Sequence, residues 1–185
     1  MRYFVMVCEG KHPVMPIAKG PKVRGRWRSG RPLSVPVTPP LVYTLDPDYP
    51  GTPKAMYYGE SVPVMRDDVV EALSRAGVDN IEYYDAILEN PLTGKPETNY
   101  KAFNIIGAVS AADMSASELM GTSNSRMGDT DFHALTLDES RTGGLLLFRL
   151  AEALNAIVVH ESVRRAIEAA GIPGFVFYGP GEWSG

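Results

Sequence analysis

The residues best suited to chemistry form one short run, Asp138–Gly144, which reads DESRTGG. It offers two carboxylates, two hydroxyls and a guanidinium within seven positions. A nucleophile elbow would require the pattern GxSxG, whereas Ser140 has a charged neighbour on each side. A phosphate-binding loop would require GxxxxGK followed by Ser or Thr, and no such string occurs in the chain. The run therefore predicts a tight turn between two strands, in which Gly143 and Gly144 supply positive φ angles.

The other candidates for catalysis or metal binding are isolated. The three histidines, His12, His133 and His160, form neither an HxH nor an HExxH pattern, so the usual spacing of a zinc site is missing. Acid–base catalysis needs carboxylates whose environments push their pKa values apart, and carboxylates paired in polar stretches give no sign of this. Such pairs are Asp67/Asp68, Asp129/Asp131 and Asp138/Glu139. We therefore expect no catalytic residue, no metal site and no cofactor.

Charge is distributed unevenly along the chain, whose net charge is −4. Residues 1–31 hold eight Lys or Arg side chains and one Glu, whereas the remainder holds ten basic and 21 acidic residues. An acidic body favours basic partners and disfavours nucleic acid or an anionic membrane. The basic tract Lys19–Arg31 surrounds Trp27. It predicts a mobile arm, a nucleic-acid contact through phosphates and stacking, or a segment that folds against the acidic body or a partner.

The elements that would position these residues are set by two similar stretches, Val64–Tyr84 and Val158–Tyr178, which lie 94 residues apart. In each stretch apolar residues recur at i, i+4 and i+7, which gives one apolar stripe on a helix of about three turns. Gly77 and Gly171 stand where these helices should end, because glycine readily adopts the left-handed conformation of a C-terminal cap. A β-rich run follows each glycine. Each copy therefore predicts a helix–strand unit that serves as scaffold.

Composition indicates one cytosolic domain. The 185 residues, 44% of them hydrophobic, suit a single globular domain with a substantial core. No apolar run approaches the roughly 18 residues of a membrane-spanning helix. The apolar run Tyr3–Cys8 is too short for a secretory signal, and a single cysteine fits a reducing compartment. Cys8 itself is expected to be a buried strand residue, since no basic neighbour in the sequence would lower its pKa.

The predicted fold is α+β: a single domain, 1–185, with a mixed, mostly antiparallel sheet and two similar helix–strand units packed on it. Residues 10–53 hold ten of the fifteen prolines and predict a long irregular segment, in which Leu41–Leu45 adds an edge strand. Asn90–Thr98 predicts a hairpin turn, and Gly121–Thr130 a surface loop. Residues 179–185 predict a flexible tail that exposes Trp183.

Several segments, in this order, resemble a known family. They are MRYFVMV, the block VMRDDVVEALSRAGVDNIEYYDAIL, the strand YKAFNIIGAVSAAD, and the run that extends from Leu135 to Tyr178. This order resembles the bacterial immunity-protein family typified by a Myxococcus protein, formerly a domain of unknown function. The resemblance covers most of residues 62–178 and the first strand. Its most distinctive part, TLDES…GG…LFRL, contains the residues expected to form a structural motif: Asp138, Glu139, Gly143, Gly144 and Arg149.

The resemblance implies an immunity protein of a polymorphic toxin system, which protects the producing cell during interbacterial competition by binding its cognate toxin. The family pattern carries no catalytic signature, so no active-site residue is transferred to this chain. An acidic body fits a basic toxin, because charge complementarity speeds association. The sequence defines no oligomeric state. The expected toxin contacts lie in predicted loops and in the tail: Asp113, Asp129, Asp131, Phe132, Glu182 and Trp183.

Two alternatives belong to other functional classes. The first is an enzyme that reverses a toxin-made modification, with Asp138, Glu139 and Arg141 converging in a pocket and having perturbed pKa values. The second is a nucleic-acid-binding module that uses Lys19–Arg31, for which the affinity would depend steeply on salt.

Overall fold

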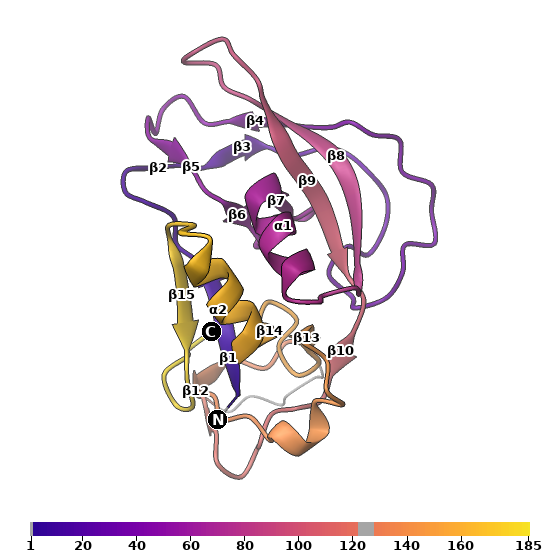
Figure 1. The fold of residues 1–185 in the computed structure, drawn as a ribbon, viewed down its shortest axis with the longest axis vertical. Coiled ribbons are helices and arrows are strands. Elements are labelled where there is room, and N and C mark those ends of the chain that lie inside the picture. Colours follow the sequence, from indigo (N-terminus) through magenta and orange to yellow (C-terminus); the bar gives the residue numbers. More distant parts are fainter. Residues whose placement is uncertain (1, 122–127) are drawn as a thin grey trace.

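The structure is a computed structural model that describes residues 2–121 and 128–185. Its helices α1 (Asp67–Arg75) and α2 (Glu161–Ala169) pack against each other between two β-sheets (Figure 1). Neither helix in the described part of the chain is long and apolar enough to cross a membrane. The predicted α+β fold with mostly antiparallel pairing is confirmed. The middle of the predicted loop Gly121–Thr130 lies outside the described residues.

The larger sheet has six strands and lies in the upper half of Figure 1. In spatial order they are β3 (Ile17–Lys19), β4 (Leu41–Leu45), β8 (Ile81–Glu89), β9 (Glu97–Ile105), β7 (Val64–Arg66) and β6 (Met56–Tyr57). The predicted hairpin turn joins β8 to β9. The expectation that Leu41–Leu45 forms an edge strand is wrong, because β3 pairs with its outer side.

The smaller sheet has five strands and lies in the lower half of Figure 1. In spatial order they are β10 (Ala108–Val109), β13 (Leu147–Leu150), β14 (Ile157–His160), β1 (Tyr3–Cys8) and β15 (Phe175–Tyr178). Two short pairs lie outside these sheets: β2 (Val14–Met15) with β5 (Thr52–Pro53), and β11 (Glu118–Leu119) with β12 (Phe132–Ala134). Cys8 is buried in β1, as predicted.

The two similar stretches adopt the same supersecondary structure. Each forms strand–helix–strand, as β7–α1–β8 and β14–α2–β15, and an antiparallel strand inserts between its two parallel strands. This arrangement is a split β-α-β unit. The inserted strand is β9 in the first unit and β1 in the second. Even the register is the same, since the laterally aligned triplets are Val64–Ala102–Tyr84 and Val158–Val5–Tyr178.

The helix boundaries follow from local chemistry. Gly77 and Gly171 adopt φ angles of +88° and +65°, which confirms their predicted place in the C-terminal caps. After α1 the amide of Val78 donates to the carbonyl of Leu73, which closes the longer bond of a Schellman motif. At the start of α2, Nδ1 of His160 accepts a hydrogen bond from the amide of Ser162. His160 is thus an N-cap residue.

The main core lies between the helix pair and the inner faces of both sheets. It is built from the predicted apolar stripes together with strand residues, and its members include Met6, Val69, Leu73, Phe103, Val159, Val163 and Ile167. Because this single core joins both units, the helices hold the two sheets together.

The outer face of each sheet is covered by an irregular segment. On the six-stranded sheet, Trp27 of the basic tract is 2% exposed, and its ring lies edge-on to Tyr84 with centroids 5.3 Å apart. Two further hydrogen bonds attach this tract. Asn104 Nδ2 donates to the carbonyl of Arg31 at 2.8 Å, and the amide of Gly107 donates to the carbonyl of Gly30 at 2.8 Å. Of the behaviours expected for Lys19–Arg31, packing against the body is the one observed.

On the five-stranded sheet the C-terminal segment is the cover. Trp183 is 7% exposed and packs near Phe132, with ring centroids 6.4 Å apart. The amide of Phe132 donates to the carbonyl of Gly185, and the amide of Gly185 donates to the carbonyl of Phe132. The expectation that residues 179–185 expose Trp183 is therefore wrong. The apolar outer face of the sheet, which includes Val5, provides the reason, because it must be shielded from water.

Three buried tyrosines tie neighbouring segments together through their hydroxyl groups: Tyr43 and Tyr100 of the six-stranded sheet bind the segment 54–62, and Tyr57 of that segment binds Met15 in β2. The hydroxyl of Tyr43 donates to the backbone carbonyl of Val62. The hydroxyl of Tyr100 donates to the carbonyl of Lys54, and the hydroxyl of Tyr57 donates to the carbonyl of Met15. Burial raises the pKa of Tyr57 to about 12 and also raises the pKa values of Tyr43 and Tyr100. These phenols therefore stay protonated in the folded protein above their ordinary pKa.

Replacing Trp27 by alanine should detach the basic tract. Removing a buried tryptophan costs about 3–5 kcal/mol of unfolding free energy. Urea denaturation should show this loss, and trypsin should cleave within Lys19–Arg31 faster than in the wild type. The control is Tyr49→Ala, because Tyr49 is 63% exposed and should leave both measurements unchanged. Equal trypsin resistance in Trp27→Ala and the wild type would contradict the packing described for Trp27.

Alkaline pH should destabilise the fold through the buried tyrosines. An unfolded tyrosine loses its proton near pH 10, whereas folded Tyr57 keeps it to about pH 12. Between these values the unfolded state binds fewer protons, so the unfolding free energy falls as the pH rises. Urea denaturation at a series of pH values should show this decline, and Tyr57→Phe should make it shallower. A pH dependence that is unchanged in Tyr57→Phe would refute the role given to this residue.

Candidate partner-binding surface

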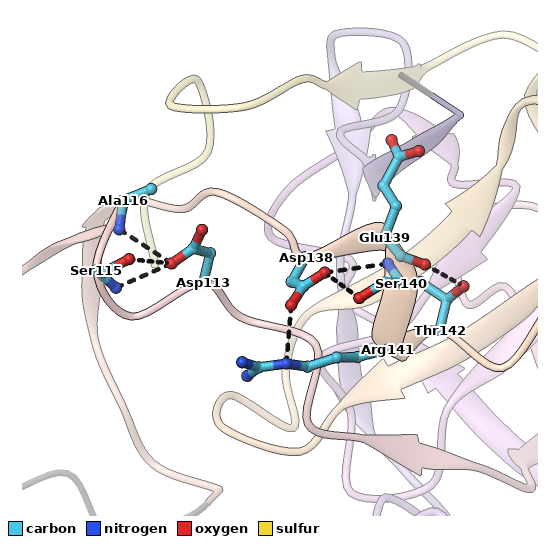
Figure 2. A network of polar contacts seen from close by, with 8 residues as sticks. All are labelled: Asp113, Ser115, Ala116, Asp138, Glu139, Ser140, Arg141 and Thr142. Atoms are coloured by element: carbon cyan, nitrogen blue, oxygen red, sulfur yellow. Dashed lines mark hydrogen bonds and ion pairs between the residues drawn. The ribbon is translucent and has the colours of Figure 1, made fainter.

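Two acidic loops lie side by side on the five-stranded half of the molecule (Figure 2). They are joined where the chain leaves Ala112 and Leu137, which form an antiparallel bridge. The amide of Asp113 donates to the carbonyl of Thr136 at 2.9 Å, and the amide of Asp138 donates to the carbonyl of Ala111 at 2.8 Å. We call residues 113–120 and 138–142 the loop-pair surface.

The first loop is closed by Asp113. Its Oδ1 atom accepts hydrogen bonds from the hydroxyl of Ser115 at 2.6 Å, the amide of Ser115 at 3.0 Å and the amide of Ala116 at 3.2 Å (Figure 2). An aspartate that bonds to its own backbone two residues on forms an Asx turn. Ser117 adds a second tie, because its hydroxyl accepts from the amide of Thr136 at 2.9 Å.

The second loop repeats this chemistry. Oδ1 of Asp138 accepts from the hydroxyl of Ser140 at 2.6 Å and from its amide at 3.1 Å, while Oδ2 pairs with Nε of Arg141 at 2.9 Å (Figure 2). Asp138 thereby caps the short 3₁₀ helix η1 (Glu139–Arg141). Gly143 and Gly144 follow with φ angles of +62° and +75°, which confirms the predicted positive φ. The run DESRTGG is thus a capped helical turn.

The same hydrogen bonds set the charge state of both carboxylates. The Ser115 hydroxyl, with the amides of the loop, lowers the pKa of Asp113. The Ser140 hydroxyl and amide likewise lower the pKa of Asp138, to which Arg141 adds. Arg141 also lowers the pKa of Asp113, so it acts on both loops. Both groups are therefore firmly ionised at neutral pH, and the loop-pair surface presents fixed negative charge.

Exposed apolar side chains accompany this charge. Met114, Leu119 and Met120 are 42%, 36% and 48% exposed. Large apolar side chains that remain accessible within a few residues of one another indicate an interaction surface more strongly than single ones do. Methionine suits such a surface because its unbranched side chain adapts to differently shaped partners.

The residues predicted to contact a partner are distributed over three places. Asp113 lies on the loop-pair surface. Asp129 and Asp131 are exposed and line a separate depression of about 420 Å³. Glu182 is exposed, and its Oε2 atom accepts from the amide of Gly179 at 2.6 Å. Phe132 and Trp183 are buried, so neither is available to a partner in this conformation.

The sequence reasoning missed Met114, Leu119 and Met120 as contact candidates. Their signal was a set of large apolar residues in a stretch of small polar ones, where no helical or strand period explains them. It also missed the repeated Asp-x-Ser pattern at Asp113 and Asp138, which is a local signature of an Asx turn. Met127, which lies in the same stretch, falls outside the described residues.

A hollow of about 390 Å³ beside η1 bears on the enzyme alternative. Its lining includes Glu139, Ser140 and His160. The Ser140 hydroxyl donates to Asp138. Nδ1 of His160 accepts from the amide of Ser162 and also lies 3.0 Å from the Ser162 hydroxyl, a serine–histidine contact that is part of the N-cap of α2. Within residues 2–121 and 128–185, no three His, Cys, Asp or Glu side chains are grouped closely enough to hold a metal ion. The enzyme alternative stays a prediction.

Replacing Ser115 by alanine should raise the pKa of Asp113, because the Ser115 hydroxyl is the largest cause of its depression. The stability that a depressed carboxyl contributes is present above its unfolded pKa, near 3.9, and is lost as the pH falls through the folded value. In Ser115→Ala the folded pKa lies nearer the unfolded one, so the total loss should be smaller and should be complete at a higher pH. Carboxyl NMR titration measures the shift directly.

Ser117→Ala is the matched control, because the Ser117 hydroxyl bonds to Thr136 and leaves Asp113 untouched. The pKa of Asp113 should therefore be unchanged in this variant. If Ser115→Ala left the Asp113 pKa at the wild-type value, the turn geometry assigned to this loop would be wrong.

Comparison of the chain with known proteins gives no family. No family model matches the chain, and no curated protein matches it. The likeness to the immunity-protein family therefore depends on the segments quoted above and on their order. What it implies for function is a proposal, which the loop-pair surface helps to evaluate.

Proposed function

We propose that this protein is an immunity protein that acts in the cytoplasm and neutralises a cognate bacterial toxin by forming a stoichiometric complex with it. The observation that carries the proposal is the loop-pair surface, where exposed Met114, Leu119 and Met120 accompany the ionised Asp113 and Asp138. Such a surface has the composition of a protein interface, with adaptable apolar anchors next to charged groups.

Rigid positioning supports the same proposal. The carboxylates of Asp113 and Asp138 are held by hydrogen bonds of 2.6 Å from neighbouring serines, so a partner need not order them on binding. Side chains that are already immobilised lose less conformational entropy when an interface forms. The loop-pair surface can therefore use its charges for recognition at a low entropic cost.

Charge also favours a basic partner. The chain outside residues 1–31 carries 21 acidic and ten basic residues. Among them, the loop-pair surface holds Asp113, Glu118, Asp138 and Glu139 against one cation, Arg141. An acidic surface attracts a basic protein over long distances and speeds its association, with a rate that falls as salt increases. A basic toxin is therefore the partner that fits best. A stable complex would bury about 1,600 Å² in total.

The proposal is tested with the toxin encoded beside this gene. Purified protein should bind that toxin at a one-to-one ratio and abolish its toxicity. Met114→Glu with Met120→Glu should weaken binding about 30-fold, since hot-spot residues contribute roughly 2 kcal/mol or more. Isothermal titration calorimetry measures the affinity, and circular dichroism confirms that the variant is folded.

Leu92→Glu is the matched control. Leu92 is 54% exposed in the turn between β8 and β9, on the other sheet, so its replacement should leave the affinity unchanged. No complex and no protection in the wild type would refute the immunity function. Wild-type affinity in the double variant, together with a loss in Leu92→Glu, would instead show that the toxin binds the opposite end of the molecule.

A further inference from the structure

The basic tract Lys19–Arg31 keeps its positive charge unpaired although it is packed on the protein. It carries six Lys or Arg side chains, and no acidic residue occurs anywhere from Gly10 to Leu45. None of these six cations forms an ion pair within residues 2–121 and 128–185. The tract is held by Trp27 and by its backbone instead, so its charge remains available to an anion from outside.

A hollow of about 700 Å³ lies on this tract and on the residues that follow it, and we call it the tract hollow. Its polar lining consists of two arginines and two serines: Arg26, Ser29, Arg31 and Ser34. Both arginines are exposed. Among the described residues no acidic side chain lines the tract hollow, so its wall does not repel an incoming anion. The Ser29 hydroxyl donates to the carbonyl of Arg26 at 2.9 Å, which closes the turn between the two arginines.

The loop that presents these side chains is fixed on both sides. Buried Trp27 anchors it next to Arg26, and the carbonyl of Arg31 accepts a hydrogen bond of 2.8 Å from a side chain of β9. The amide of Leu33 donates to Oε2 of Glu82 at 3.2 Å, so this carboxylate binds backbone rather than a guanidinium. A loop that is already ordered loses less conformational entropy when a ligand binds.

The charge of the tract is also felt inside the protein. Arg149 in β13 is 0% exposed, and its Nη1 atom donates to the carbonyl of Leu154 at 2.7 Å. Burial, and after it the charge of Arg28, lowers the pKa of Arg149 to about 10. Arg149 is still a cation at neutral pH, and it is repelled by the tract. The acidic body therefore does not neutralise the tract.

We propose that the tract hollow binds the phosphate monoester of a small molecule, with Arg26 and Arg31 pairing with its oxygens and the Ser34 hydroxyl donating to them. Guanidinium groups match phosphate geometry, because two parallel N–H groups reach two oxygens at once. A monoester carries close to two negative charges and three acceptor oxygens, which is enough for two guanidinium groups.

Nucleic acid fits the tract hollow less well. Proteins that bind single strands use aromatic rings on which the bases stack, and Trp27, the aromatic residue of the tract, is 2% exposed. Each phosphodiester of a nucleic acid also carries one charge instead of two. The tract covers the six-stranded sheet, whereas the loop-pair surface belongs to the five-stranded half, so the phosphate site does not rest on the proposed toxin binding.

The test titrates the whole protein with methyl phosphate at pH 8 and constant ionic strength, and it follows the backbone amide signals by NMR. The amides of Gly25, Ser29 and Ser34 should shift and saturate, with a dissociation constant of about 1 mM for two charge-assisted contacts. Arg26→Gln and Arg31→Gln should each weaken binding about tenfold. Both side chains are exposed, so both variants should fold.

Arg24→Gln is the matched control, because Arg24 is an exposed cation of the same tract that does not line the hollow. Its affinity for methyl phosphate should stay within about twofold of the wild type, since solvent and salt screen charges outside the site. Dimethyl phosphate, a diester with a single charge, should bind about tenfold more weakly than methyl phosphate.

Three results would overturn the proposal. The first is the absence of a saturating shift with methyl phosphate. The second is equal weakening in Arg24→Gln and Arg26→Gln, which would reduce the site to diffuse attraction by the tract. The third is binding of dimethyl phosphate, or of a single DNA strand of about ten nucleotides without terminal phosphates, that is as tight as that of methyl phosphate. This last result would assign the tract to nucleic acid.

Discussion

Both sheets are apolar on both faces, and the rest of the architecture follows from the need to cover all of them. The helix pair covers one face of each sheet and forms the shared core. The opposite faces carry Val64 and Ala102 in one unit and Val158 and Val5 in the other, all of which are buried. Leaving them exposed would forfeit the main driving force of folding, at about 25 cal/mol for each Å² of apolar surface. Two segments without regular structure supply these covers.

This constraint explains why the two covering segments are not free for recognition as mobile arms. Each cover contains a buried tryptophan: Trp27 lies against the six-stranded sheet and Trp183 against the five-stranded one. A proline-rich or glycine-rich composition predicts the absence of helix and strand, yet it says nothing about whether the segment packs on a neighbour. Met114 and Met120 belong to neither cover and stay accessible.

The sequence predicts well those features that depend on near neighbours in the chain, such as helices and their caps. The stripes of α1 and α2 recur at helical spacing, and Gly77 and Gly171 act on the turn in which they stand. The inserted strands depend on long-range pairing instead. β9 follows the first unit directly in the chain, whereas β1 precedes the second unit by some 150 residues. The equivalence of β1 and β9 leaves one trace in the sequence, the matching tyrosines Tyr3 and Tyr100. The burial of Trp183 escapes local reasoning for the same reason.

Arg149 lies in a regular strand, yet the fold alone does not explain why this position holds an arginine. Its strand neighbours are apolar, and an apolar side chain of similar size at this position would avoid the cost of desolvating a charge. Replacing buried charges by well-packed apolar residues is often neutral or stabilising, so stability alone does not account for an arginine here. The bond that Arg149 does make, from Nη1 to the carbonyl of Leu154, ties β13 to the turn that follows it.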